Sequence, residues 1–232
     1  MKPYRLVLLD VDGTLVSCGG AGRRALERVL REACQEPDGD LSALRLDGST
    51  DRLIVRHAME ILEYPFTEEA CDRALERYVG LLEAELSDTS FLVLPGAPEL
   101  LESLRRRGQP YGLCTGNVRE GARLKLRRGA LDGYFEWGPQ AVGGFASDGE
   151  VRARLVEAAV RRAITRHGPL APGEAVVVGD TPLDIEAAHA AGCAALAVAT
   201  GRYGADELRS CGAEHVVESL AVPLARRLLS GP

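Results

Sequence analysis

The hydrophobic pattern of the chain changes after Phe91. Before it, apolar residues recur at spacings of three and four in segments 22–33, 49–63 and 68–86, which predicts amphipathic helices. No convincing strand is predicted between residues 16 and 88. After Phe91, short apolar runs alternate with helical patterns, as in a chain built from strand–helix units.

Repeated strand–helix units favour a parallel sheet with helices on both faces. The sequence therefore predicts an α/β fold, a Rossmann-like core over 1–14 and 93–232 with a small all-helical insertion over 15–92. The double glycine at 143–144 is interpreted as a loop. Strands are predicted at 5–9, 110–117, 174–180, 193–201 and 215–217, and helices at 95–108, 118–128, 151–166, 182–192 and 219–229.

Composition narrows the classes of function. The chain has 232 residues, 46% of them hydrophobic, a net charge of -6 and a pI near 5.4. An acidic chain without a run of basic residues is not expected to bind nucleic acid. The short apolar run near the N-terminus predicts neither a signal peptide nor a membrane span. Six scattered cysteines without CxxC spacing fit a cytoplasmic protein. The chain is expected to be a monomer or a homodimer.

Polar residues gather where three predicted strands end. Asp10, Asp12, Gly13 and Thr14 follow the first, and the segments 115–117 (Thr-Gly-Asn) and 179–184 (Gly-Asp-Thr-Pro-Leu-Asp) follow two others. Ligands of parallel sheets bind at this edge, beside helix N-termini. Several carboxylates there suit Mg²⁺, and the neighbouring hydroxyls suit a phosphate group.

The order DVDGT, TGN, GDTPLD resembles that of the haloacid dehalogenase-like hydrolase superfamily, in its phosphatase branch. The resemblance implies that Asp10 is the nucleophile, that Asp12 is the general acid and base, and that Thr115 binds the transferring phosphoryl group. It also implies a Mg²⁺ site formed by Asp10, Asp12, Asp180 and Asp184. Phosphate would be bound by Gly13, Thr14, Gly116 and Asn117.

The third motif of that family departs from the usual pattern. Relatives usually have a lysine about 25 residues before the GD pair, and no lysine stands there. Arg152, in the setting Asp148…Arg152…Leu155, is the preferred replacement, since a guanidinium binds phosphate bidentately. Arg154 and Lys125 are the alternatives that the sequence leaves open.

The insertion over 15–92 resembles the helical cap of these phosphatases, which covers the site and recognises the leaving group. Glycines at 19–22 would help a hinge. The segment 47–51 reads as a helix N-cap. Ser49, Thr50 and Arg52 are expected to face the substrate, although capping and surface roles explain them equally well.

The sequence thus favours a phosphatase acting on a small phosphorylated metabolite, with a phosphoglycolate phosphatase-like cap. One alternative is a sugar-phosphate mutase of the β-phosphoglucomutase type, which shares these motifs. A phosphonate hydrolase would need a cap lysine, and segment 15–92 has none. A non-enzymatic alternative is an inactive protein that binds phosphometabolites. The substrate itself is not set by these motifs.

Overall fold

The computed structural model describes residues 4–87 and 90–230, and its centre is a parallel sheet. Apolar four- and five-residue runs form the inner strands because both faces of the sheet are covered. Every pairing in this sheet is parallel. Its spatial order is β5 (Gly143–Gly144), β4 (Tyr111–Cys114), β1 (Leu6–Leu9), β6 (Ala175–Gly179), β7 (Ala194–Val198) and β8 (His215–Val217). The predicted α/β fold class is confirmed.

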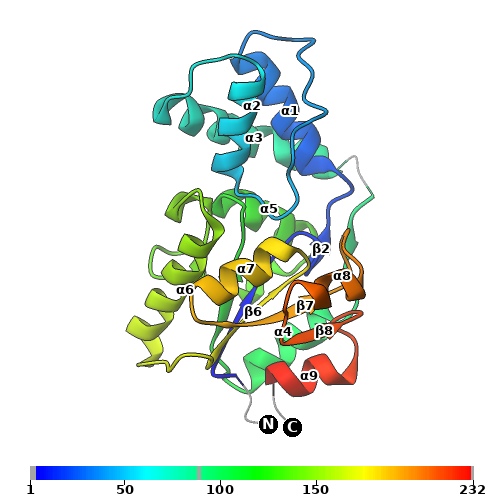
Figure 1. Cartoon of the computed structure of the whole chain (residues 1–232), viewed down its shortest axis with the longest axis vertical. Helices are drawn as coiled ribbons and strands as arrows, with labels where there is room; N and C mark the ends of the chain where they lie inside the picture. The colour runs from blue at the N-terminus through cyan, green and yellow to red at the C-terminus, as the bar shows by residue number, and fades with distance from the viewer. Residues whose placement is uncertain (1–3, 88–89, 231–232) are drawn as a thin grey trace.

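Alternate residues of β1 enter different cores, as the two-residue period of a strand requires. Leu6 and Leu8 pack with the helices on one face of the sheet, and Val7 and Leu9 pack with those on the other. Figure 1 shows these two layers of helices around the sheet. The first layer holds α6 (Arg152–His167), α7 (Pro182–Ala190) and α8 (Ala205–Ser210), and the second holds α4 (Ala97–Arg106), α5 (Arg119–Arg128) and α9 (Pro223–Ser230).

Three further helices stand beyond the carboxyl edge of the sheet (Figure 1). These are α1 (Ala21–Ala33), α2 (Asp51–Ile61) and α3 (Glu68–Ser87). All three predicted helices of the insertion are confirmed to within a few residues. The division of the chain at 15–92 stays a prediction.

Short elements account for the errors in the prediction. The chain passes to and from the three helices through an antiparallel pair, β2 (Val16–Ser17) and β3 (Leu92–Val93), where no strand was expected before residue 88. The glycines at 143–144 form edge strand β5 rather than a loop. A Cβ on Gly144 would lie 1.9 Å from the Leu155 carbonyl oxygen, so close helix–strand packing explains that glycine. Two-residue strands carry no hydrophobic alternation for a sequence to reveal.

Candidate active site

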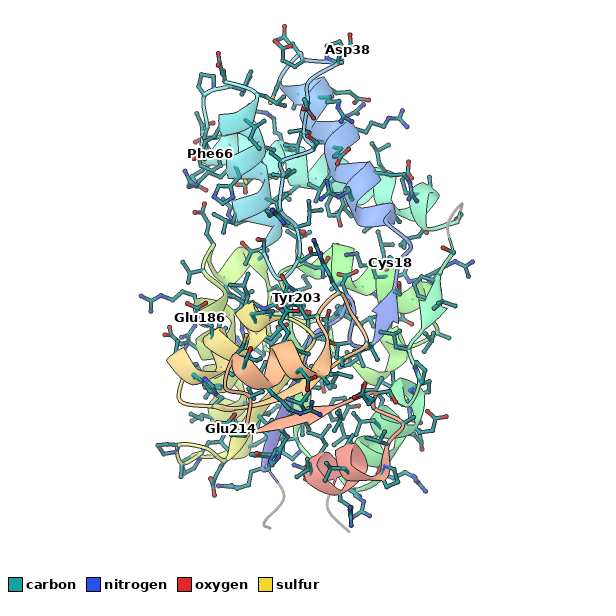
Figure 2. The ribbon with its side chains drawn as sticks, turned by 45° about the vertical axis from the view of Figure 1, so that its right-hand side comes forward. Cys18, Asp38, Phe66, Glu186, Tyr203 and Glu214 are labelled. Atoms are coloured by element: carbon teal, nitrogen blue, oxygen red, sulfur yellow. The ribbon has the colours of Figure 1, made fainter. Side chains whose placement is uncertain are left out.

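The carboxyl ends of β1, β4 and β6 meet the three helices at a cavity of 390 Å³. Asp10, Asp12, Thr115 and Asp180 all line it, although their strands are far apart in sequence. Figure 2 labels Cys18 and Tyr203 at this junction between the helices and the sheet. Both residues also line the cavity. The structure therefore brings the three predicted polar strand ends together.

The site divides into two halves, each built around one aspartate of the DVD segment. In the first half, Asp10 is paired with the Arg152 guanidinium. Its Oδ2 is 3.0 Å from an Arg152 terminal nitrogen, and the same nitrogen is 2.5 Å from Asp184 Oδ1. The other Asp184 oxygen accepts hydrogen bonds from the Thr181 hydroxyl and backbone N–H, so it completes the capping box of α7. A second Arg152 nitrogen donates to the Gly48 carbonyl. The guanidinium thus has a fixed position beside Asp10.

Negative charge exceeds positive charge in this half of the site. Burial, opposed by Arg152 but supported by Asp184 and Asp12, raises the pKa of Asp10 to about 6. Burial and the nearby Asp184 and Asp10 carboxylates raise the pKa of Asp180 to about 9. Three carboxylates facing one guanidinium disfavour full ionisation unless another cation joins them.

A hard cation fits these carboxylates. One oxygen from each of Asp10, Asp180 and Asp184 lies within 4.8 Å of the others, and all three residues are buried. The Asp180 carboxylate is backed by two glycines. A Cβ on Gly13 or on Gly201 would lie 2.2 or 1.8 Å from Asp180 Oδ2. Both oxygens of Asp184 are occupied, one by Arg152 and the other by Thr181, so Asp10 and Asp180 are the freer carboxylates for a hard cation such as Mg²⁺, which prefers few carboxylates and several waters.

Asp12 lies in the second half, paired with a different cation. Its Oδ2 is 2.6 Å from Lys125 Nζ and accepts a 2.8 Å hydrogen bond from Asn117 Nδ2. Lys125 also donates to Asn117 Oδ1 at 2.6 Å, and Asn117 donates to the Thr115 hydroxyl at 2.7 Å. This chain of contacts orders the Asp12 carboxylate beside Thr115.

Lys125 decides the charge of Asp12. Burial alone would raise the pKa of Asp12, but Lys125 and then Asn117 outweigh it, so the pKa is lowered. The pKa of Lys125 is correspondingly raised well above its usual value, because the attraction of Asp12 exceeds the cost of burial. Asp12 and Lys125 therefore form an ion pair at neutral pH, and burial does not raise the pKa of Asp12 as it raises that of Asp10.

The structure places both candidate cations of the third motif in the site, on different aspartates. Arg152 contacts Asp10, whereas Lys125 contacts Asp12. Arg154 points to solvent and pairs with Glu157 on the same helix. Of the three sequence candidates, Arg154 alone lies away from the cavity.

Several predicted substrate residues have other partners. Ser49, Gly13, Gly116 and Asn117 line the cavity. The remaining three do not: the Thr14 hydroxyl donates to Asp180, the Thr50 hydroxyl caps α2 and donates to the Glu150 carbonyl, and Arg52 pairs with Glu68 and Asp72. The N-cap at 47–51 is thus observed at Thr50. Its hydroxyl and the Arg52 guanidinium are occupied away from the substrate space.

The structure also adds residues that the motifs did not reveal. Tyr78 of α3 and Gly22 of α1 line the cavity from the helical side, and so does Asp51 at the start of α2. Asp51 accepts a 2.7 Å hydrogen bond from Val118 N–H. Each sits on an amphipathic helix, where one buried polar residue is hidden among many apolar ones. Lys125 could be singled out from the sequence, because Lys2 is the only other lysine in the chain.

Cys114 is a buried strand residue, as expected, and burial raises the pKa of its thiol. That shift opposes a thiolate nucleophile. Among the residues that the structure describes, no helix is long and apolar enough to cross a membrane.

Comparison with known proteins agrees with this geometry. The family model of the haloacid dehalogenase-like hydrolases matches residues 4–192. A phosphoglycolate phosphatase of Rhodospirillum rubrum is 29% identical over 94% of this chain and 88% of its own length. "Probable phosphatase IndB" of Dickeya dadantii is 29% identical over 95% of this chain and 91% of its own. A hydrolase structure from Pseudomonas syringae superimposes with a TM-score of 0.68 at 22% identity, covering 96% of both chains.

The chain belongs to the haloacid dehalogenase-like hydrolase family. The family resemblance and the hydrolase class predicted from the sequence are therefore confirmed. The phosphatase names of the two sequence relatives support a phosphatase among the hydrolases.

Proposed function

We propose that this protein is a Mg²⁺-dependent phosphatase that hydrolyses a small phosphorylated metabolite through an aspartyl-phosphate at Asp10. The observation that carries the proposal is the division of labour between the two aspartates. Asp10 adjoins the carboxylates that can hold a metal, whereas Asp12, two residues later, is paired with Lys125 and lines the same cavity. One carboxylate can then attack phosphorus while the other moves a proton.

In the first step an Asp10 carboxylate oxygen attacks phosphorus. The bond from phosphorus to the ester oxygen breaks, and that oxygen takes its electron pair and a proton from Asp12. Asp12 then removes a proton from a water molecule, whose oxygen attacks the aspartyl-phosphate. Inorganic phosphate leaves and the Asp10 carboxylate is restored. Protonated Asp12 is needed in the first step, so its lowered pKa implies proton uptake when substrate binds.

Positive and hydrogen-bonding groups hold the transferring phosphoryl group. Arg152 beside Asp10, the Thr115 hydroxyl and the backbone near Gly116 provide donors around the point of attack. Asp10 and Asp180 would hold Mg²⁺, with Asp184 fixing Arg152 and Thr14 orienting Asp180. When bound, the metal supplies positive charge against the phosphoryl oxygens.

The substrate is proposed to be a small phosphorylated acid of the phosphoglycolate kind. The sequence relative from Rhodospirillum rubrum carries that activity in its name. The cavity of 390 Å³ supports a small leaving group. Helices α1–α3, in the proposed cap over 15–92, would exclude water and contact that leaving group.

Phosphate release from a panel of phosphorylated metabolites, with and without Mg²⁺, tests the proposal. The native protein is compared with Asp10→Asn, which keeps the shape of the side chain but removes the nucleophile. We expect metal-dependent release that falls by at least about 10³-fold in the variant. Release that persists in Asp10→Asn or with a chelator would refute the mechanism.

The mutase alternative has its own outcome. A mutase would release little phosphate from any single substrate, yet would isomerise a sugar phosphate when a sugar bisphosphate activator is present. Neither release nor isomerisation would favour a protein that only binds phosphometabolites.

A further inference from the structure

The cavity contains a buried hydroxyl without a partner. Tyr78 lies on α3 and is fully buried, and its hydroxyl forms no hydrogen bond with any residue that the structure describes. An unsatisfied buried hydroxyl costs free energy, which native proteins rarely leave uncompensated. Because Tyr78 lines the cavity, a ligand can supply the missing partner.

Lys125 has one donor left over beside this hydroxyl. An ammonium has three N–H donors, and two are directed to Asp12 Oδ2 and Asn117 Oδ1. Lys125 is also buried, at 5% exposure, so water does not freely satisfy the third. Tyr78 and Lys125 interact electrostatically, which agrees with their proximity.

Gly22 keeps the space between these two groups open. A Cβ built on Gly22 would lie 3.4 Å from Lys125 Nζ and 3.5 Å from the Tyr78 hydroxyl oxygen. Gly22 lies inside α1, where glycine is a poor helix former and alanine would be better. A glycine at this position therefore costs helix stability but places no side-chain atom between the two donors.

Two converging donors require an acceptor. One oxygen of Asp12 already accepts from both Lys125 and Asn117, one oxygen of Asp51 accepts from Val118 N–H, and neither carboxylate is hydrogen-bonded to the Tyr78 hydroxyl. A carboxylate suits the vacant place best, because it accepts from a hydroxyl and an ammonium at once.

We propose that Tyr78 and Lys125, with the space kept by Gly22, form a subsite for a carboxylate on the leaving group. This inference rests on the proposed phosphatase function. Lys125 touches Asp12, which is proposed to protonate the ester oxygen, so the subsite lies close to that oxygen. The carboxylate must then be on the carbon that bears the ester oxygen. Short 2-phosphooxy carboxylic acids meet this condition, and longer phosphosugars do not.

A series of three nearly isosteric substrates tests the subsite. 2-Phosphoglycolate offers a carboxylate, 2-hydroxyethyl phosphate a hydroxyl, and ethyl phosphate neither. We expect the native protein to prefer phosphoglycolate over ethyl phosphate in kcat/KM. In Tyr78→Phe the ratio of these two kcat/KM values should fall by about 10-fold or more, as expected for losing a hydrogen bond to a charged group.

Two further variants separate the subsite from a structural role. Gly22→Ala should lower the same ratio while its Tm stays level or rises, since alanine favours the helix but fills the space. Tyr64→Phe is the matched control, because Tyr64 is a half-buried tyrosine of the same helical region outside this cavity. Its ratio should equal that of the native protein.

The possible failures are distinguishable. An unchanged ratio in both Tyr78→Phe and Gly22→Ala, or a preference for 2-hydroxyethyl phosphate, would overturn the carboxylate subsite while leaving the phosphatase intact. Calorimetric binding of phosphoglycolate and ethyl phosphate to Asp10→Asn runs in parallel and needs no turnover. A stronger binding of phosphoglycolate that Tyr78→Phe abolishes in this background would support the subsite even if hydrolysis failed. Equal binding of the two would refute it.

Discussion

The two halves of the site contain the two aspartates of one DVD segment, yet they are built differently. The charged side chains of the Asp10 half all come from the α/β part of the chain, and they gather Asp180 and Asp184 near the single guanidinium of Arg152, to which the insertion adds only the Gly48 carbonyl. The Asp12 half has one carboxylate matched by one ammonium, and it adjoins the helical region through Tyr78 of α3. One half has three carboxylates near one guanidinium, whereas in the other the Asp12 carboxylate has an ammonium of its own.

This difference corresponds to two chemical tasks. A site with excess buried carboxylate binds a cation and a phosphoryl group, which every phosphate ester shares. In the proposed function, the Asp12 half, which touches the helical region, handles the leaving group, which differs between substrates. Under this proposal, substitutions in the Asp12 half would change the substrate while the chemistry of the Asp10 half stays the same.

The largest expected effect follows from removing the cation of the Asp10 half. Arg152→Ala should lower kcat/KM by about 10³-fold, because a buried, charge-assisted contact to the phosphoryl group and to Asp10 is lost. Arg152→Lys keeps the charge but loses the second donor to Gly48, so it should recover part of the loss. Initial rates with a saturating range of substrate measure both.

Arg154→Ala is the matched control for Arg152→Ala, since it removes the same side chain two residues along the same helix. Arg154 is exposed and paired only with Glu157, so its removal should change kcat/KM by less than about 2-fold. An equal or larger loss in Arg154→Ala would contradict the assignment of the third motif to Arg152.

A smaller, more selective effect is expected in the Asp12 half. Lys125→Met removes the cation that orders Asp12 but keeps much of the side-chain volume. We expect kcat for ethyl phosphate to fall by about 10–100-fold, because its alkoxide needs a proton from a well-placed acid and the lost position of Asp12 outweighs its easier protonation without Lys125. Hydrolysis of p-nitrophenyl phosphate should fall less, since its phenolate leaves more easily. Neither substrate carries a carboxylate, so the effect is separate from the subsite.

Arg23→Met controls for the loss of positive charge from the same cavity. Arg23 lines the cavity, but its guanidinium is bound to Glu27 and the Leu44 carbonyl. Any change in kcat of Arg23→Met should be equal for ethyl phosphate and p-nitrophenyl phosphate. An equal loss for both substrates in Lys125→Met would mean that Lys125 has only a structural role.

The carboxylates of the Asp10 half could be predicted from the sequence because polar residues that end a buried strand are easy to recognise. Asp10 and Asp180 each follow an uninterrupted apolar run, and parallel strands bring their carboxyl ends to one edge. The sequence preferred Arg152 for its setting before the GD pair but left Arg154 and Lys125 open, and the structure places Arg152 beside Asp10. These signals are local, so each could be read within a few residues.

The Asp12 half could not be predicted in the same way. Lys125 reaches Asp12 across 113 residues of sequence, and Tyr78 arrives from a helix of the insertion. The angle at which that helix packs on α5 decides whether Tyr78 faces the cavity, and no local pattern encodes that angle. Thr50 and Arg52 were expected to face the substrate, but the structure gives their side chains other partners. Their position next to a helix start was right, but their side chains bind the Glu150 carbonyl and two acidic residues instead.

The smallest expected effect concerns Asp51, where the helical region joins the Asp12 half. Its backbone N–H donates to the Gly116 carbonyl and its carboxylate accepts from Val118 N–H, both at 2.7 Å. Burial, only partly opposed by Lys125, raises the pKa of Asp51 from 3.8 to about 6. The folded protein therefore holds a proton there that the unfolded chain has already lost between about pH 4 and pH 6. Stability from this group is full below pH 4 and declines as pH rises to 6.

Asp51→Asn removes this titration but keeps an acceptor for Val118 N–H. The free energy of unfolding of the native protein, relative to the variant, should fall by about 1–2 kcal/mol between pH 4 and pH 6 and stay level above pH 6. Urea unfolding at several pH values measures the difference, and Asp38→Asn on an exposed loop is the control. A difference that grows in the opposite direction would mean that Lys125 outweighs burial at Asp51. The Lys125 ammonium would then keep Asp51 ionised at a lower pH than burial alone allows.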